Sequence, residues 1–99
     1  MLIIGVVGAG TMGSGIAQVA IAAGETVKLF DPVAEASLRG RDMIKKNLNF
    51  LVDKKKLTSD ESSDIFSRLD IINSLSDLAS CDLVIEEIVE NESVKKDLF

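Results

Sequence analysis

Three glycines near the amino terminus have the spacing of a phosphate-binding turn. Gly8, Gly10 and Gly13 make the pattern G-x-G-x-x-G inside the uncharged stretch VVGAGTMGSGIAQVA. In such a turn the three positions allow a sharp bend, close approach of a pyrophosphate, and close packing of a helix on a strand. The N–H groups and the dipole at the start of that helix favour phosphate charge. We therefore expect a pyrophosphate site lined by the whole loop: Gly8, Ala9, Gly10, Thr11, Met12 and Gly13.

An acidic residue follows at the distance that such a site needs. Asp31 lies 23 positions after Gly8, at the end of a second apolar run, and no arginine directly follows it. An aspartate there can accept hydrogen bonds from both hydroxyls of an adenosine ribose, and it would repel a 2′-phosphate. We therefore expect NAD rather than NADP as the cofactor. The alternative is a glycine-rich packing turn followed by an ordinary helix-capping aspartate.

The hydrophobic pattern locates the elements that must position these residues. Residues 2–7 form a short, β-branched apolar run, typical of a strand buried on both faces. Residues 12–23 carry apolar side chains at helical spacing, and residues 25–30 form a second strand. The glycine pattern thus lies where a buried strand turns into a helix. Gly15, two positions further on, is expected to serve the same close packing.

The remaining elements complete an α/β pattern. Asp31 and Pro32 open a long helix to about residue 54, with Asp31 at or beside the cap and Pro32 in the first turn. Thr58 and Glu61 have capping-box spacing and start another helix. Next come a strand (69–74), a helical turn (76–79), a buried strand (82–89) and a helix (90–99). This order predicts a Rossmann-type fold: a parallel sheet with helical crossovers, and an extra helical pair between the second and third strands.

Composition favours one small folded domain. The chain has 99 residues, with 46% hydrophobic and 27% charged residues. A net charge of −5 without a basic stripe argues against nucleic acid as a partner. Cys81 is the lone cysteine, so a reducing cytoplasm is the expected location. The sequence has no histidine, the commonest metal ligand and proton shuttle, and we expect no metal site.

The uncharged stretch from residue 1 to residue 24 has about the length of a membrane span. Its glycines and its polar side chains dilute the apolar character, and no lysine or arginine precedes it as in a secretory signal. We therefore expect no membrane association.

Three longer segments carry a more specific pattern than the glycines. They are GVVGAGTMGSGIAQVAIAAGETVKLFD, NLNFLVDKKKLT and DLVIEEIVENESVKKDLF. Together they resemble the amino-terminal domain of the 3-hydroxyacyl-CoA dehydrogenases, including the bacterial 3-hydroxybutyryl-CoA enzymes, over nearly the whole chain. The family oxidises the 3-hydroxyl of an acyl-CoA to a ketone and passes hydride to NAD.

The resemblance implies a role for two residues on the cofactor side. Glu90 and Lys95, in VENESVK, match positions that contact the cofactor nearer its nicotinamide half. Glu90 also follows a buried strand at its carboxyl end, where doubly wound sheets bind ligands. Without the resemblance, Glu90 is equally well explained as a first-turn helix acid and Lys95 as a solvated helix charge.

The resemblance also gives the extra helical pair a role, because in the family this pair leans over the cleft and touches coenzyme A. Lys54 falls where the family has a lysine for the coenzyme's phosphates, although Lys55 and Lys56 leave the exact lysine open. Asn47 falls where many members carry serine, and asparagine can still form hydrogen bonds. Taken alone, Lys54 is equally well explained as a solvated surface lysine.

No residue of this chain is expected to be catalytic. Removal of the hydroxyl proton needs a base with a pKa near working pH, and the family's histidine base lies beyond a position equivalent to Phe99. The helical domain through which members dimerise lies there too. We interpret residues 1–99 as the amino-terminal part of a dinucleotide-binding domain, without the catalytic and dimerisation regions, and expect the missing half of the sheet to leave an apolar flank exposed. The alternative is a free-standing NAD-binding regulatory module without catalysis.

Overall fold

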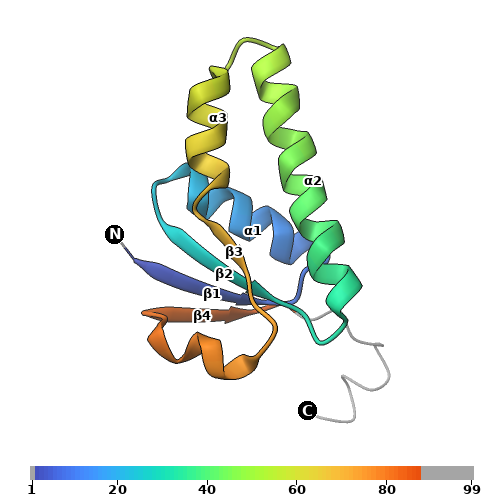
Figure 1. Cartoon of the computed structure of the whole chain (residues 1–99), viewed down its shortest axis with the longest axis vertical. Helices are drawn as coiled ribbons and strands as arrows, with labels where there is room; N and C mark the ends of the chain where they lie inside the picture. Colours follow the sequence, from blue (N-terminus) through green and yellow to red (C-terminus); the bar gives the residue numbers. More distant parts are fainter. Residues whose placement is uncertain (1, 88–99) are drawn as a thin grey trace.

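The structure is a computed structural model that describes residues 2–87. In chain order its elements are β1 (Ile3–Val7), α1 (Thr11–Ala22), β2 (Thr26–Phe30), α2 (Ala34–Asp53), α3 (Ser59–Phe66), β3 (Leu69–Ile71), the 3-10 helix η1 (Leu75–Ser80) and β4 (Leu83–Glu86) (Figure 1). The expected helix over residues 90–99 lies outside the described residues. Between residues 2 and 87, no helix is long and apolar enough to cross a membrane.

The strands form one parallel sheet in the order β3-β2-β1-β4. β1 lies between β2 and β4, and Val7 at its carboxyl end pairs with Phe30 on one side and Glu86 on the other. The strand order reverses at β1, and sheets of this kind bind ligands beyond the carboxyl ends of the strands at that reversal. The expected Rossmann-type fold is confirmed, with α2 and α3 as the extra helical pair between β2 and β3.

The two faces of the sheet are covered differently. The helices α1, α2 and α3 lie on one side of the sheet and η1 on the other (Figure 1). The core on the helical side is formed by nine buried residues: Ile4, Val6, Ala9, Ala17, Ile21, Val27, Leu29, Ile44 and Leu48. On the opposite side η1 approaches β1 so closely that a Cβ added at Gly5 would lie 2.7 Å from Leu78 Cδ2. The expectation that β1 is buried on both faces is therefore confirmed.

The start of α2 differs from the prediction. The helix begins at Ala34 with Val33 as its N-cap, so the placement of Pro32 in its first turn is wrong. The physical reason is that the Asp31 carboxylate is bonded elsewhere: Oδ1 accepts from the N–H of Val33 at 2.8 Å, and Oδ2 accepts from Ala9. This local turn delays the helix by two residues.

The prediction that β4 is a buried strand is also wrong. Leu83 and Val84 are exposed, because β4 is the edge strand of the described sheet. The expectation of an exposed apolar flank is met by these two side chains.

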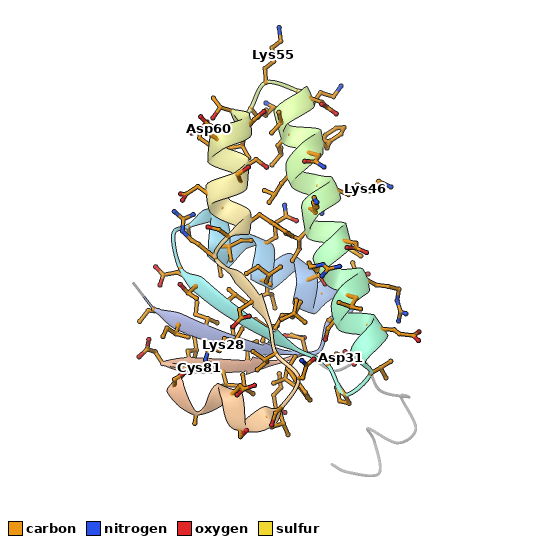
Figure 2. All side chains as sticks on the ribbon, in the orientation of Figure 1. Lys28, Asp31, Lys46, Lys55, Asp60 and Cys81 are labelled. Carbon is orange, nitrogen blue, oxygen red and sulfur yellow. The ribbon has the colours of Figure 1, made fainter. Side chains whose placement is uncertain are left out.

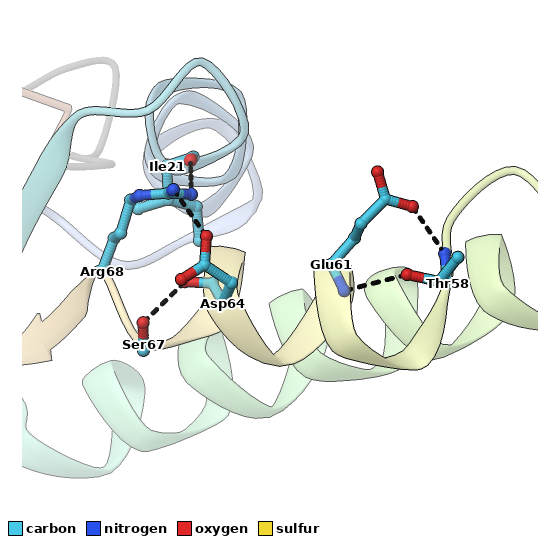
Figure 3. A network of polar contacts seen from close by, with 6 residues as sticks. All are labelled: Ile21, Thr58, Glu61, Asp64, Ser67 and Arg68. Carbon is cyan, nitrogen blue, oxygen red and sulfur yellow. Dashed lines mark hydrogen bonds and ion pairs between the residues drawn. The ribbon is translucent and has the colours of Figure 1, made fainter.

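A polar network at both ends of α3 fixes this helix to its surroundings (Figure 3). At its start the predicted capping box is present: Thr58 Oγ1 accepts from the N–H of Glu61 at 3.1 Å, and Glu61 Oε1 accepts from the N–H of Thr58 at 2.9 Å. The hydrogen bond from the Thr58 backbone lowers the pKa of the Glu61 carboxyl. After the helix, Arg68 donates to the carbonyl of Ile21 at 3.2 Å and to Asp64 Oδ2 at 2.7 Å. Arg68 therefore joins α3 to the last turn of α1.

We expect Arg68→Ala to lower the free energy of unfolding by about 1–3 kcal/mol, the range for losing charged hydrogen bonds at a partly buried site. The Arg68 side chain is 25% exposed. The matched control is Arg39→Ala, which removes an ion pair to Glu35 whose two side chains are 69% and 86% exposed. Arg39→Ala should lower the free energy of unfolding by about 0.5 kcal/mol or less. Urea unfolding of both variants measures the difference, and equal losses would contradict the bridging role of Arg68.

Candidate functional site

The glycine loop joins β1 to α1 in the predicted way. Gly8 has a φ of 110°, a conformation that glycine adopts without strain. Gly10 is the N-cap of α1, and no side chain of the described residues caps the helix there. The first intrahelical bond runs from the N–H of Ser14 to the carbonyl of Gly10 at 2.9 Å. The N–H groups of Thr11, Met12 and Gly13 therefore have no partner within α1, and they form a site suited to an anion.

Gly13 packs closely, whereas Gly15 does not. A Cβ added at Gly13 would lie 1.8 Å from the carbonyl oxygen of Gly8, so only glycine fits there. A Cβ added at Gly15 would meet nothing within 4 Å, and the expectation of close packing at Gly15 is therefore wrong for the described part of the chain. Gly15 instead lines an apolar depression of about 720 Å³ on the outer side of α1, together with Thr11, Met12, Ile16 and Val19.

Asp31 lies directly against the glycine loop. Its Oδ2 accepts a hydrogen bond from the N–H of Ala9 at 2.9 Å, and the N–H of Gly8 donates to the carbonyl of Phe30 at 2.7 Å. These bonds bring the carboxyl ends of β1 and β2 together, so the predicted ribose-binding residue and the predicted phosphate loop form one site. Asp31 is half-buried at this edge of the sheet (Figure 2).

A contact between α1, α2 and the loop was not predicted from the sequence. The Ser14 hydroxyl donates to the carbonyl of Ala9 at 3.0 Å and is buried. A Cβ added at Gly40 of α2 would lie 2.6 Å from Ser14 Oγ and 3.0 Å from the carbonyl oxygen of Ala9. Gly40 therefore lets α2 support the loop from behind. The available signal was a glycine in a helix interior, which costs about 1 kcal/mol relative to alanine unless packing requires it.

The predicted coenzyme A residues lie on the second half of α2, away from the loop. Asn47 Nδ2 donates to Gln18 Oε1 of α1 at 2.9 Å. Lys54 is the C-cap of α2, and its Nζ lies 5.5 Å from the centre of the Phe50 ring. The structure thus brings the loop and Asp31 together and places Asn47 and Lys54 elsewhere. Glu90 and Lys95 lie outside the described residues.

Comparisons with known proteins agree with this geometry. The family model of the 3-hydroxyacyl-CoA dehydrogenase NAD binding domain matches residues 3–99. A 3-hydroxybutyryl-CoA dehydrogenase from Bradyrhizobium diazoefficiens is 46% identical over 96 residues, which are 97% of this chain and 33% of that protein. The 3-hydroxyadipyl-CoA dehydrogenase of Escherichia coli is 44% identical over 96 residues, covering 97% of this chain and 20% of the relative.

Solved structures are similar over almost the whole chain. An (S)-3-hydroxybutyryl-CoA dehydrogenase from Ralstonia eutropha superposes with a TM-score of 0.87 at 34% identity, covering 99% of this chain and 35% of that one. The chain thus spans about a third of the length of the two 3-hydroxybutyryl-CoA dehydrogenases and a fifth of the 3-hydroxyadipyl-CoA dehydrogenase.

Proposed function

Since the chain belongs to the 3-hydroxyacyl-CoA dehydrogenase family, matching its NAD-binding domain, we propose that it supplies the NAD-binding part of an enzyme interconverting 3-hydroxyacyl-CoA and 3-ketoacyl-CoA. The observation that carries the proposal is the hydrogen bond between Asp31 and the N–H of Ala9, which places a carboxylate beside an uncapped helix start. A site of this kind suits a dinucleotide whose pyrophosphate and ribose diol lie a few ångströms apart.

In the proposed complex, the N–H groups of Thr11, Met12 and Gly13 bind the pyrophosphate. Each Asp31 oxygen already accepts one backbone hydrogen bond and has a lone pair left for a ribose hydroxyl. Bound NAD supplies the hydride acceptor for the 3-hydroxyl carbon. We place Glu90 and Lys95 nearer the nicotinamide half on the basis of the family resemblance alone.

On the substrate side we propose that Asn47 and Lys54 contact coenzyme A. Asn47 is already held by Gln18, and the Lys54 ammonium has no ion-pair partner among residues 2–87. Lys55, with a φ of 60°, and Lys56 extend the same basic end of α2, so either could share the phosphates.

The proton-transfer base and the dimer interface are proposed to lie in regions that the longer relatives have and this chain does not span. We propose that the whole enzyme is a cytoplasmic homodimer. The alternative is a free-standing NAD-binding module without catalysis, and the absence of histidine from this chain is compatible with either proposal. A chimera that joins residues 1–99 to the remaining two-thirds of the Bradyrhizobium relative separates the two, because only the dehydrogenase proposal expects turnover.

Cofactor choice tests the role of Asp31. We expect NADH to bind more tightly than NADPH. Asp31→Ala should reduce the difference between their binding free energies by roughly 1–3 kcal/mol. The change also removes the hydrogen bond to Ala9, but that loss should weaken the binding of NADH and NADPH alike. The ratio of their two dissociation constants therefore isolates the ribose contact. Calorimetry gives this ratio.

The matched control is Asp82→Ala. Asp82 Oδ2 accepts from the N–H of Ile3 at 2.8 Å, at the opposite end of β1, so its loss should leave the ratio unchanged. Equal affinity of the unaltered chain for NADH and NADPH would remove Asp31 from the proposed role.

A further inference from the structure

Phe50 is an exposed aromatic side chain between two lysines on the second half of α2. It is 57% exposed, while the core side of the same helix is formed by the buried Ile44 and Leu48. Lys46 and Lys54 lie four residues before and after it, so all three share one helical stripe. Lys46 points outward from the helix (Figure 2). The Lys54 ammonium lies 5.5 Å from the ring centre. The ring is therefore a flat apolar surface with a cation on each side.

A groove of about 440 Å³ runs beside the ring. It is lined by Asp42, Lys45, Lys46, Asn49, Phe50 and Asp53. Among residues 42–56 five lysines stand against two aspartates, a local charge of +3, in a chain with a net charge of −5. Asp42 is further compensated by Arg41, whose Nη2 lies 3.2 Å from its carboxylate. No ion pair within residues 2–87 occupies the lysines of this segment. The groove thus combines a stacking surface with unpaired ammonium groups.

We propose that Phe50 stacks on the adenine of the adenosine 3′,5′-bisphosphate end of an acyl-CoA, and that Lys46 joins Lys54 in binding its phosphates. This inference rests on the proposed function. Exposed aromatic rings beside basic side chains are a general means of holding a base and its phosphate. The base takes the ring face that Lys54 covers, and the released ammonium turns to a phosphate. The position complements Asn47 and Lys54 and makes Phe50 a specificity-determining residue for the coenzyme.

The adenine at Phe50 cannot be the adenine of NAD. Phe50 lies 16 residues beyond the start of α2 at Ala34, which is about 24 Å along a helix. Asp31, at the edge of the phosphate loop, lies before that start. Two nucleotides can therefore bind together, one at each end of α2.

The experiment titrates the chain with adenosine 3′,5′-bisphosphate in the presence of saturating NADH. Phe50→Ala should weaken binding roughly 5- to 100-fold, the range for losing one base–aromatic stack, whereas Phe50→Tyr should stay within about twofold. NADH affinity should not change in either variant. Leu38→Ala, which truncates another exposed apolar side chain of α2, is the matched control and should have no effect. Equal binding by the Phe50→Ala variant and the unaltered chain would overturn the inference.

A second measurement separates this inference from the proposed function. In the active chimera, Phe50→Ala should raise KM for acetoacetyl-CoA and leave KM for acetoacetyl-pantetheine, which lacks the nucleotide, unchanged. If the chimera with Phe50 and the chimera with Phe50→Ala have the same KM for acetoacetyl-CoA, the stacking role of Phe50 is contradicted, while the proposed function stands. A chimera without turnover, built on a chain that does not bind NADH, contradicts the proposed function itself.

Discussion

The 99-residue chain by itself is expected to reduce acetoacetyl-CoA with NADH at the uncatalysed rate, while the chimera with the Bradyrhizobium relative turns it over. In the proposed enzyme the chain supplies phosphate contacts, a ribose-binding carboxylate and a coenzyme A surface. It has no histidine, and the Asp31 carboxylate at the loop is bonded to Ala9 and Val33, at the proposed cofactor site. A positioned general base contributes about 10²- to 10⁴-fold, and loss of substrate orientation costs more.

The assay follows NADH absorbance at equal molar concentrations of the chain, the chimera and the carboxyl-terminal part of the relative by itself. Binding of NADH to the chain is measured first, so that absence of turnover is not confused with an unfolded sample. The chimera carrying Asp31→Ala should be slowed at low NADH concentration, which ties its activity to the site on this chain. Turnover by the purified chain at the rate of the chimera would refute the assignment of catalysis to the region of the relatives that this chain does not span.

Replacing glycine by alanine at position 10 is expected to affect cofactor binding, whereas the same change at position 13 is expected to affect the stability of the fold. Gly10→Ala should abolish NADH binding and lower the free energy of unfolding by less than about 1 kcal/mol. Its φ of −70° and ψ of −171° suit any residue, and a methyl group there would occupy pyrophosphate space. Gly13→Ala should instead damage the fold, because its Cβ would lie 1.8 Å from the Gly8 carbonyl oxygen, a backbone atom that no side-chain rotation can move away.

For Gly13→Ala we expect a loss of about 1–3 kcal/mol or more, a large part of the stability of a small domain. Urea unfolding and NADH titration of the two variants give both quantities. Gly15→Ala is the control, since its Cβ would meet open space, and it should leave the fold intact. Normal NADH affinity in the Gly10→Ala variant would show that the loop does not hold a pyrophosphate.

The sequence predicts most of the fold because most of its signals are local. The glycine pattern, the apolar strands and the capping box of Thr58 and Glu61 depend on residues a few positions apart, and all three appear in the structure. The start of α2 is misplaced because Asp31 forms a turn with Val33 through one carboxylate oxygen, while the other oxygen accepts from Ala9, 22 residues away in the chain. The burial of β4 was misjudged because a run of apolar residues does not say whether a strand has a neighbour on both sides.

The sequence identifies the candidate site residues that belong to a local motif and misses the residues whose role depends on packing between helices. The loop and Asp31 follow from spacing alone. The support of the loop by Ser14 and Gly40 depends on how two helices cross, and no local pattern encodes a crossing. The exposure of Phe50 likewise depends on which side of α2 faces the sheet, and its partners become visible only once the helix is placed.

The bond between Asp31 and Ala9 limits how this protein could change its coenzyme during evolution or design. A switch to a 2′-phosphorylated cofactor requires removal of the negative charge at Asp31. The same carboxylate, however, satisfies a backbone N–H of the glycine loop, and a buried donor without a partner costs about 1–3 kcal/mol. Simple deletion of the side chain would therefore loosen the loop before any new specificity is gained. A workable route keeps a neutral oxygen acceptor, such as asparagine or serine, for Ala9 and introduces the cation on a neighbouring residue. In the proposed complex, the preference for NAD would thus depend on a structural bond as well as on the ribose contact.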